Sequence, residues 1–250
     1  MLPLCLGEAT KLSGYLLDSD KRYRVRAAVG HCTTTGDAEG PPTRRSDAAG
    51  LTREALEIAL PKFVGPILQR PPMYSALKKD GRPLYELARE GIEVERAERA
   101  ITIYGIELLS FGPGSFELDV RCSKGTYIRT LVEDLAAAAG QCAHVAALRR
   151  TGAGPFAEGQ MLSLEALEAL ARQGLAALDA RMLPVLDGLA GWTRVAVEPE
   201  AARRLAHGQS VRVSGQVQPG LVAVTGEGAT LLGLAELQAS GELVPKRWLA

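Results

Sequence analysis

The chain has 250 residues, of which 29 are basic and 29 acidic, so its formal net charge is zero. This balance excludes a histone-like or polybasic nucleic-acid binder, although a local basic face is compatible with it. Hydrophobic residues make up 46% and charged residues 23% of the chain, which excludes a disordered tail protein, a collagen-like fibre and a coiled-coil rod. No run of about 18 apolar residues occurs, so we expect no membrane span.

The cysteines are few and widely spaced, and no C-x-x-C pair occurs among them: Cys5, Cys32, Cys122 and Cys142. This spacing favours free thiols in a reducing compartment, which we expect to be the cytoplasm. A histidine stands next to Cys32 and another close to Cys142, so a metal site is the alternative. The ligand spacings of zinc sites are missing, and we therefore expect no metal.

The first half of the chain alternates between regular patterns and loops. Apolar spacing predicts a helix over 8–18, and strict alternation predicts a strand over 22–29. The stretch 33–50 is rich in Thr, Gly, Pro and Asp and predicts a long loop. Thr52 is the expected N-cap of a short helix that runs to Leu60.

Prolines break the stretch 61–83, which we expect to be an ordered loop, and a helical turn follows over 84–88. Alternation on both sides of a Gly-Pro-Gly turn predicts a hairpin of the strands 101–109 and 115–122. Thr126 is the expected N-cap of a helix to about Ala139. A strand over 142–151 and a helix over 163–171 complete this part.

Short β-rich runs with glycine turns dominate from Trp192 onward, at 194–198, 210–214, 221–225 and 230–235, with a short helix over 199–206. They predict a small barrel-like module with a boundary near 187–191. The whole pattern predicts an α+β protein with a mixed sheet, followed by this module.

Three segments carry residues suited to nucleic acid. The first is the basic strand around Lys21 and Tyr23, in which arginines face one side and apolar residues the other. The pattern alone favours a solvated charged face and a core tyrosine; the alternative is a strand that lies beside a polyanion.

The second segment, residues 123–130, contains Lys124, Tyr127 and Arg129 at the start of the predicted helix. A cation in the first helical turn opposes the helix dipole, so Arg129 requires a nearby anion. That anion is either a carboxylate partner or an RNA phosphate; an ordinary capped helix with an exposed arginine is the alternative.

The third segment, residues 71–78, places Tyr74 and Lys78 behind two prolines. A stiff loop of this kind can hold a nucleic-acid backbone while a base stacks on the tyrosine ring. The alternative, which the pattern alone favours, is a rigid surface connection.

Together these segments resemble the TruB family of tRNA pseudouridine synthases. The matching stretches follow the family's order and cover most of residues 1–155: 1–11, 15–26, 72–78, 84–94, 122–130 and 143–150. The C-terminal module is similar in place and size to the PUA-type RNA-binding module of bacterial members. This similarity rests on the barrel-like pattern and on residues 244–247 near the end of this sequence. The resemblance divides the chain into a synthase domain over 1–188 and a PUA-like module over 189–250.

The resemblance implies an isomerase that acts on uridine 55 in the T loop of tRNA, without cofactor or metal. It implies that the N1–C1′ bond is cleaved and the base rejoined through C5, after the uridine is flipped into a pocket. The partner would be the T arm of tRNA, bound by a monomer.

The resemblance also implies roles for individual residues. Tyr23 matches the tyrosine that stacks on the base, and Arg129 matches the arginine that pairs with the catalytic aspartate. Tyr127 and Leu148 match positions that line the pocket. From charge and position we expect Lys21, Lys78, Lys124 and Arg149 to contact phosphates, and Tyr74 to contact the substrate.

The family's catalytic aspartate lies in a Gly-rich motif just before the segment that begins this sequence. We therefore expect Arg129 to lack its carboxylate partner, the sheet to lack a strand and the chain alone not to isomerise uridine. The corresponding alternative function is a catalytically inactive tRNA-binding fragment.

Overall fold

The structure is a computed structural model that describes residues 1–214 and 218–249. Contacts divide the chain into two units: Met1 with Ser19–Ala153, and Leu2–Asp18 with Gly154–Ala250. In the described ranges no helix is both long and apolar enough to cross a membrane.

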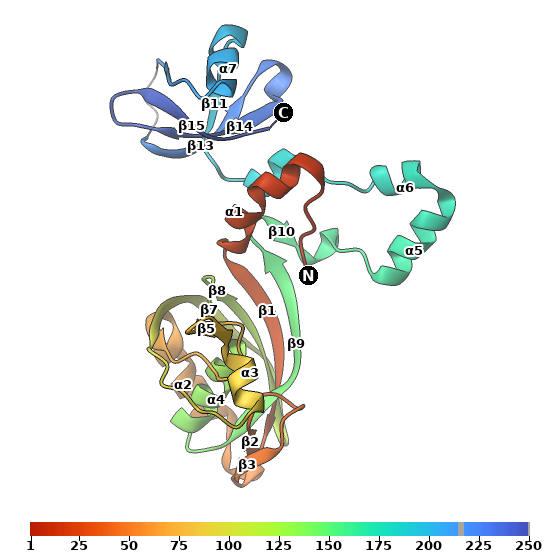
Figure 1. Ribbon diagram of the computed structural model, residues 1–250. Helices are drawn as coiled ribbons and strands as arrows, with labels where there is room; N and C mark the ends of the chain where they lie inside the picture. Colours follow the sequence, from red (N-terminus) through yellow and green to blue (C-terminus); the bar gives the residue numbers. More distant parts are fainter. Residues whose placement is uncertain (215–217, 250) are drawn as a thin grey trace. The chain divides into compact units, whose positions relative to one another are not determined.

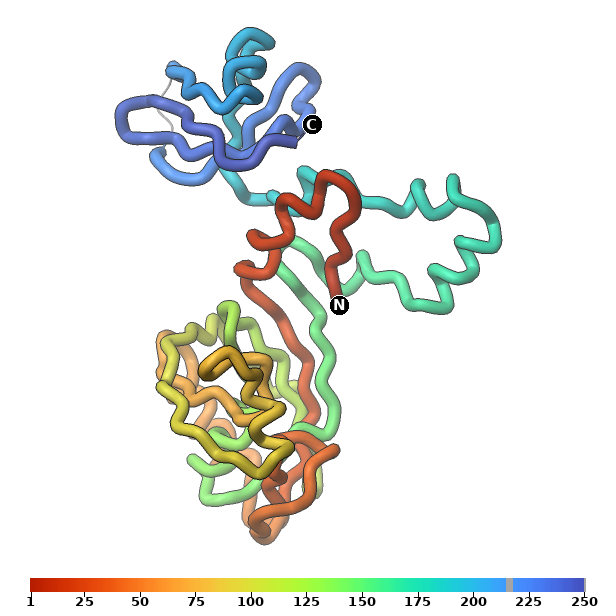
Figure 2. The backbone as a smooth tube through the Cα atoms, in the orientation of Figure 1, coloured from red at the N-terminus to blue at the C-terminus, as the bar shows by residue number. Residues whose placement is uncertain are grey.

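The first unit is built on an antiparallel sheet with the strand order β9-β1-β8-β7-β4. Its strands are β1 (Lys21–Val29), β4 (Gly65–Gln69), β7 (Arg99–Gly112), β8 (Ser115–Cys122) and β9 (Ala143–Ala153). Strand β1 lies between β8 and β9, which follow it by about a hundred residues in the sequence (Figure 2). The sheet therefore depends on pairing between distant parts of the chain.

The period-2 pattern of β1 is confirmed and determines which face enters the core. Val25 and Ala27 are fully buried, whereas Arg24 and Arg26, which alternate with them, are exposed. Val25 is directly opposite Leu118 of β8, and Ala27 is opposite Phe116. Burial of both members of such cross-strand pairs fixes the register, because a slip by one residue would expose them.

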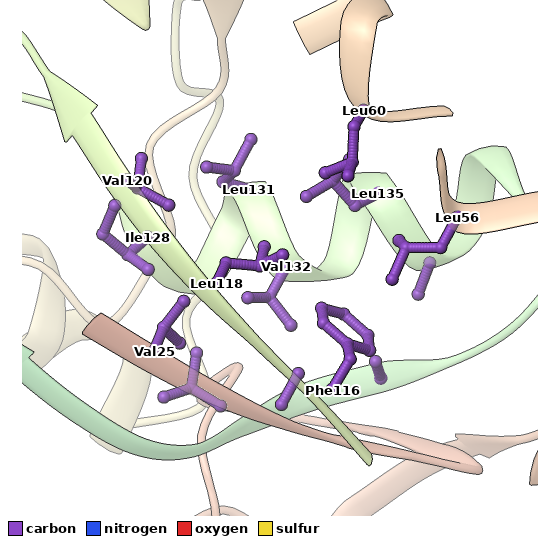
Figure 3. Close-up of a cluster of buried hydrophobic side chains, with 14 of the residues drawn as sticks. Val25, Leu56, Leu60, Phe116, Leu118, Val120, Ile128, Leu131, Val132 and Leu135 are labelled. Carbon is purple, nitrogen blue, oxygen red and sulfur yellow. The ribbon is translucent and has the colours of Figure 1, made fainter. Parts of the chain in front are cut away.

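One face of this sheet is covered by the predicted central helix, α4 (Ile128–Ala138), with α2 (Arg53–Ala59) beside it (Figure 1). The buried side chains of α4 meet those of β1 and β8 in one cluster, in which Val25, Leu118, Leu131, Val132 and Leu135 are labelled in Figure 3. Each fully buried leucine of this kind stabilises the fold by about 2 kcal/mol. The core therefore fixes both ends of α4 against the sheet.

Two predicted loops contain regular structure. The stretch 33–50 is not a continuous loop, because β2 (His31–Thr33) pairs with β3 (Pro42–Arg45) before a 3-10 turn at Ala48–Gly50. The stretch 61–83 contains β4, which pairs with β7, and the short strands β5 (Lys78–Lys79) and β6 (Arg82–Pro83). The proline-rich composition concealed these strands, which hold short, exposed or edge positions where proline is tolerated.

The other helices of the first unit follow the prediction. Thr52 caps α2 by accepting a hydrogen bond from the Ala55 amide, and the predicted turn at 84–88 is α3 (Leu84–Arg89). A 3-10 segment at Leu60–Phe63 continues α2. The predicted hairpin is β7–β8, with a first strand longer than expected.

The second unit contains a sheet with the order β11-β13-β14-β15-β12, in which β11 and β13 are parallel. Its strands are β11 (Arg194–Ala196), β12 (Val211–Arg212), β13 (Gly220–Thr225), β14 (Leu231–Leu237) and β15 (Glu242–Trp248). The predicted helix at 199–206 is α7 (Pro199–Ala206). The prediction of an α+β protein with a small β module is confirmed, and β15 is an additional strand. The parallel pair lies in this module, whereas the strand pairs β9–β1–β8–β7–β4 of the first unit are antiparallel.

The remaining elements of this unit are helical or very short: the 3-10 helix η1 (Gly7–Leu12), α1 (Ser13–Leu17), β10 (Phe156–Ala157), η4 (Glu158–Gln160), α5 (Leu164–Gln173), α6 (Leu175–Asp179), η5 (Val185–Leu189) and η6 (Glu227–Ala229). The helix predicted over 8–18 is thus half 3-10. Ser163 caps α5, as predicted, by accepting a hydrogen bond from the Ala166 amide.

The N-terminal segment packs within this second unit. Leu12 is buried with Leu189 and Leu234, and the Tyr15 ring meets the Trp192 ring edge-on at 5.3 Å. The Lys11 ammonium donates a hydrogen bond to the Trp248 carbonyl oxygen. The two units are defined by contacts and each combines separate stretches of the chain. They therefore do not test a single boundary in the sequence, and the domain boundary at 188/189 stays a prediction.

Candidate functional site

Arg129, in the first turn of α4, is held by oxygen atoms from two separate loops. Its Nη1 donates to the Thr35 carbonyl oxygen and to Asp37 Oδ2, both at 2.9 Å, and its Nη2 donates to the Tyr74 carbonyl oxygen at 2.6 Å. The side chains of Arg129 and Asp37 are 24% and 26% exposed. The anion that the helix dipole requires beside Arg129 is therefore Asp37. Arg129 thus has a carboxylate partner, which is not the catalytic aspartate that the resemblance implies.

The segment between β2 and β3 is shaped to present Asp37. The Thr35 hydroxyl donates to Asp37 Oδ1 at 2.6 Å, and the Glu39 amide donates to the same oxygen at 3.1 Å. The segment is fastened to β9, because Ala38 and Gly36 exchange backbone hydrogen bonds with Val145. Burial alone would raise the pKa of Asp37, but these hydrogen bonds and Arg129 lower it overall, so the carboxylate stays ionised.

Gly36 is required at this point by both conformation and space. Its φ is +74°, in the left-handed region, and a Cβ atom added to it would lie 3.2 Å from the Cβ atom of Arg129. Any larger residue would push the segment away from α4 and lengthen the ion pair between Asp37 and Arg129.

The start of α4 is fixed by a side chain of the neighbouring strand β4. The buried Gln69 accepts a hydrogen bond from the Tyr127 amide at 2.8 Å and donates to the Tyr127 carbonyl oxygen at 3.0 Å. The N-cap is therefore Tyr127 and not Thr126, whose hydroxyl donates instead to the Ser123 carbonyl oxygen. Gln69 satisfies a backbone amide at a helix end that no cap side chain serves.

Glu133 lies one turn beyond Arg129 on α4. Burial and the negative charge of Asp134 raise its pKa to about 6, although Arg129 and Arg44 oppose the shift. The vicinity of Arg129 thus contains one strongly ionised carboxylate, Asp37, and one that titrates near neutrality.

Tyr23 is half-buried on β1 and packs against the core, as the alternation predicts. It is opposite Val120 on β8 and Arg150 on β9. Burial and the Cys122 thiol raise the pKa of its hydroxyl, and a hydrogen bond with the Arg150 guanidinium opposes that shift. Tyr23 is therefore neutral at physiological pH.

Leu148 lies on β9, two residues before Arg150, and is opposite Val25 of β1. Its side chain is 46% exposed although Val25 is fully buried. A large apolar side chain is thus available at the surface two register positions from Tyr23.

Tyr74 and Lys78 lie in a loop that backbone hydrogen bonds hold in place, from Tyr85 to Ser75 and from Leu84 to Leu77. Tyr74 is half-buried, and its carbonyl oxygen is one of the three acceptors of Arg129. Lys78 is exposed on β5. Two backbone hydrogen bonds therefore fasten the loop, and the loop contributes the Tyr74 carbonyl oxygen to the groups around Arg129.

The remaining predicted contacts lie on the surface of the same unit. Lys124 is exposed in the turn before α4, and Arg149 is exposed on β9. Lys21 is half-buried, and its ammonium donates to the carbonyl and hydroxyl oxygens of Ser19. At least one exposed arginine of β1 has a protein partner in addition to solvent, because Arg22 donates a hydrogen bond to Asp119 at 2.6 Å.

The structure thus brings Arg129 together with the Tyr74 carbonyl oxygen, and it places Leu148 of β9 two register positions from Tyr23 of β1. Our sequence reasoning missed Thr35, Asp37 and Gln69. The available signal for Asp37 was the run Thr-Thr-Thr-Gly-Asp, which is typical of a turn in which a short polar side chain binds nearby amides. Among the described residues no group of three or more His, Cys, Asp or Glu side chains is placed to hold a metal.

Three family models match the chain in succession. Residues 1–128 match the TruB family pseudouridylate synthase (N terminal domain), and residues 129–190 match the tRNA pseudouridylate synthase B C-terminal domain. Residues 193–249 match the model described as pseudouridine synthase II TruB, C-terminal. The last match covers the β module of the second unit, which is PUA-like.

Curated relatives are similar over nearly the whole chain. The tRNA pseudouridine synthase B of Stutzerimonas stutzeri is 50% identical over 248 residues, which is 99% of this chain and 81% of that protein. The protein of the same name from Pseudomonas aeruginosa shows the same identity and coverage. That from Chromohalobacter salexigens is 47% identical over 100% of this chain and 80% of its own length.

Solved structures share the fold at lower identity. A chain of a Cbf5-Nop10-Gar1 complex matches with a TM-score of 0.74 and 21% identity, over 98% of this chain and 71% of that chain. A chain of an H/ACA RNP bound to a substrate RNA containing 2'-deoxyuridine matches with a TM-score of 0.72 and 20% identity, over 98% of this chain and 70% of that chain. These solved structures show that the fold is shared. The family models and the curated relatives show that the chain belongs to the TruB family of pseudouridine synthases.

Proposed function

We propose that this protein converts uridine 55 in the T loop of tRNA to pseudouridine. The observation that carries the proposal is the 50% identity over 99% of the chain to relatives named tRNA pseudouridine synthase B. The reaction breaks the N1–C1′ bond of the uridine and joins C5 to C1′, and a base must leave the stack for this to occur. Two groups of described residues support it. The first, the Arg129 cluster, consists of Arg129 with Thr35, Asp37 and Tyr74; the second consists of Tyr23 and Leu148.

Arg129 retains capacity for one more anion. A guanidinium has five N–H groups, and its three described hydrogen bonds use two at Nη1 and one at Nη2. Within the described part of the chain this leaves the Nε–H and one Nη2–H for a carboxylate or a phosphate. Asp37 and the two loop carbonyls then act as positioning groups that fix the guanidinium before the substrate arrives.

Tyr23 supplies the aromatic surface for the flipped base, and Tyr127 and Leu148 supply apolar walls. Base–aromatic stacking contributes about 1–3 kcal/mol per base and does not need an ionised ring. The neutral, core-supported Tyr23 suits this role, because packing against the sheet holds its ring in place.

The tRNA backbone contacts would come from Lys21, Lys78, Lys124 and Arg149, with Tyr74 beside them in the same unit. The PUA-like module, which we assign to residues 189–250 after a synthase domain over 1–188, would add RNA contacts of its own. We further propose that the protein works as a monomer on the T arm, in the cytoplasm.

The test is pseudouridine formation in a tRNA transcript labelled with tritium at uridine C5, since the isomerisation releases that hydrogen to water. We would assay the 250-residue chain and a second protein that joins Met1 to the Gly-rich, aspartate-containing segment of a TruB relative. The control for the second protein replaces the aspartate of that added segment with asparagine. A transcript with cytidine at position 55 controls for position.

Tritium release by either protein, dependent on uridine 55, would support the proposal, and loss of release in the asparagine control would assign the chemistry to that aspartate. Tight T-arm binding by the chain without release, together with release by the extended protein, would assign catalysis to the extended form and binding to the chain. Absence of release from both proteins would overturn the proposal.

A further inference from the structure

Two thiols lie close to Arg44 of the hairpin β2–β3, and the family resemblance assigns no role to either of them. Cys32 lies on β2 opposite Arg44 of β3, and Cys142 lies just ahead of β9. Arg44 Nε donates to Cys142 Sγ at 3.1 Å, and its Nη2 approaches Cys32 Sγ at 3.7 Å. One guanidinium therefore contacts both sulfur atoms, and both cysteines are free thiols.

The two thiols differ in their acidity. Although burial opposes it, hydrogen bonds from Arg44, Cys32 and Ser46 lower the pKa of Cys142. Burial and its hydrogen bond to Cys142 raise the pKa of Cys32. Cys142 therefore ionises more readily than Cys32, which suits Cys142 to attack an oxidant and Cys32 to resolve the product.

We propose that Cys142 and Cys32 form a redox-active dithiol that hydrogen peroxide converts to a disulfide. The Cys142 thiolate attacks one peroxide oxygen, the O–O bond breaks, and the departing hydroxide takes a proton to become water. The product, a sulfenic acid on Cys142, is then attacked by Cys32 sulfur. The S–S bond forms as the S–O bond breaks, and the Cys32 proton leaves with the hydroxyl group as a second water.

The surroundings allow a small oxidant to reach the pair. Cys142 is only 3% exposed, but Cys32 is half-buried, and Arg44, which contacts both sulfur atoms, is exposed. Cys122 provides the contrast in the same unit, because it is fully buried and burial raises its pKa to about 11. Peroxide should therefore oxidise Cys142 more readily than Cys122.

The disulfide would fasten the segment that carries Asp37. Cys32 immediately precedes the loop from Thr33 to Pro41, and Cys142 immediately precedes β9, to which that loop is hydrogen-bonded at Val145. A covalent link between the two would restrict the separation of the loop from β9. The inference does not depend on the proposed reaction, because it concerns only these side chains.

The test is a peroxide titration of the full chain, followed by peptide mapping without reductant. We expect a crosslinked pair of peptides containing Cys32 and Cys142, which has lost two hydrogen atoms and is restored by dithiothreitol. Cys32→Ser and Cys142→Ser should each abolish the crosslink, whereas the matched variants Cys5→Ser and Cys122→Ser should retain it. Arg44→Gln should slow the reaction of Cys142 several-fold.

Crosslinks that join other cysteines at the same peroxide concentration would overturn the inference. So would conversion of the thiols to sulfinic acid in the wild-type chain without a crosslink between Cys32 and Cys142. These outcomes are read from the unaltered protein, so they stand even where a serine variant folds poorly. A normal circular dichroism spectrum of each variant shows whether its result can be compared with that of the wild type.

Discussion

The Arg129 cluster of the first unit and the β module of the second unit use charge in opposite ways. In the cluster a three-quarters-buried guanidinium joins α4 to two loops through Asp37 and two carbonyl oxygens. In the module the buried cluster consists of apolar side chains, with Thr225 as a buried polar residue on β13. Charged residues pair on the surface, as Lys246 and Glu236 do at 43% and 47% exposure.

The difference shows where polar interactions define structure in this chain. Surface ion pairs contribute little, because water solvates the separated charges almost as well. A three-quarters-buried guanidinium with three fixed acceptors holds its loops in one geometry, and its removal takes one hydrogen-bond donor from each acceptor. Substitutions of the buried polar groups around Arg129 should therefore be costly, and those at the surface ion pairs of the module should have little effect on stability.

The largest expected effect is that of Arg129→Met, which leaves Asp37 ionised and partly buried without its partner. We expect a loss of about 3 kcal/mol in the free energy of unfolding of the first unit. The matched substitution Lys246→Met in the module should cost less than about 1 kcal/mol. Thermal unfolding followed by far-ultraviolet circular dichroism measures both.

Both tryptophans, Trp192 and Trp248, lie in the second unit, so their fluorescence provides an internal control. Arg129→Met should lower the circular dichroism transition while the fluorescence transition stays in place. Equal losses in the two matched variants would remove the contrast between the two regions.

The next effect concerns Gln69, which is 3% exposed and serves both backbone groups of Tyr127. Gln69→Leu leaves a buried amide at the start of α4 unpaired and should cost about 2 kcal/mol. Gln173→Leu, at the exposed end of α5 in the second unit, should change stability by no more than about 0.5 kcal/mol. Urea unfolding curves of the two variants give the comparison.

Gln69→Glu refines this experiment, since a carboxylate can still accept from the Tyr127 amide but cannot donate to its carbonyl oxygen. It should lie between the wild type and Gln69→Leu above pH 6. A Gln69→Leu variant as stable as the wild type would mean that water replaces the side chain at the helix end.

Local pattern was sufficient to predict the central elements of the first unit. The alternation of β1 and the buried stripe of α4 are visible in the sequence, because in each element apolar residues recur at a fixed spacing on the side that faces the core. Strand β4 was missed because Pro66 lies within it, and only its position at the edge of the sheet makes that proline acceptable. Edge position is a property of the assembled sheet and cannot be read from five residues.

The candidate site likewise contains one feature that local sequence predicts and others that depend on distant segments. The helix dipole correctly predicted that Arg129 requires an anion, since that argument uses only the first turn of α4. The identity of the anion, Asp37, depends on the pairing of its loop with β9 more than a hundred residues later. Gln69 was equally hidden, because its partner is a backbone group of a distant segment.

A smaller effect tests the titration of Glu133. Burial raises its pKa to about 6 from an ordinary value near 4.5, so the folded protein binds this proton more tightly than the unfolded chain. The stability that it contributes is present at low pH and is lost as the pH rises from about 4.5 through 6. Glu133→Gln should therefore be more stable than the wild type by about 1 kcal/mol at pH 7, allowing for partial solvation, and equally stable below pH 4.5.

Urea unfolding between pH 4 and pH 8 measures this difference. Glu168→Gln, which removes an exposed carboxylate of α5, should shift the free energy of unfolding by no more than about 0.5 kcal/mol. A difference between Glu133→Gln and the wild type that grows as the pH falls would contradict the assigned direction, and would point to Asp37, whose lowered pKa has the opposite dependence.

The smallest effect on stability and the clearest on binding is expected for Lys78→Glu. Lys78 is exposed on β5, so its reversal should change the free energy of unfolding by less than about 0.5 kcal/mol. If it contacts a tRNA phosphate, as we propose, affinity should fall and the slope of log K against log salt should decrease by about 1. Fluorescence anisotropy with a labelled T-arm stem–loop, at several salt concentrations, measures both.

Lys62→Glu is the matched control, because Lys62 is an equally exposed lysine of the same unit that the family resemblance does not place at the RNA. The two variants alter net charge by the same amount, so a long-range field would weaken binding by both to a similar degree. A local phosphate contact predicts a changed slope for Lys78→Glu alone. Equal slopes would remove Lys78 from the RNA surface and leave the Arg129 cluster as the part of the site defined by specific contacts.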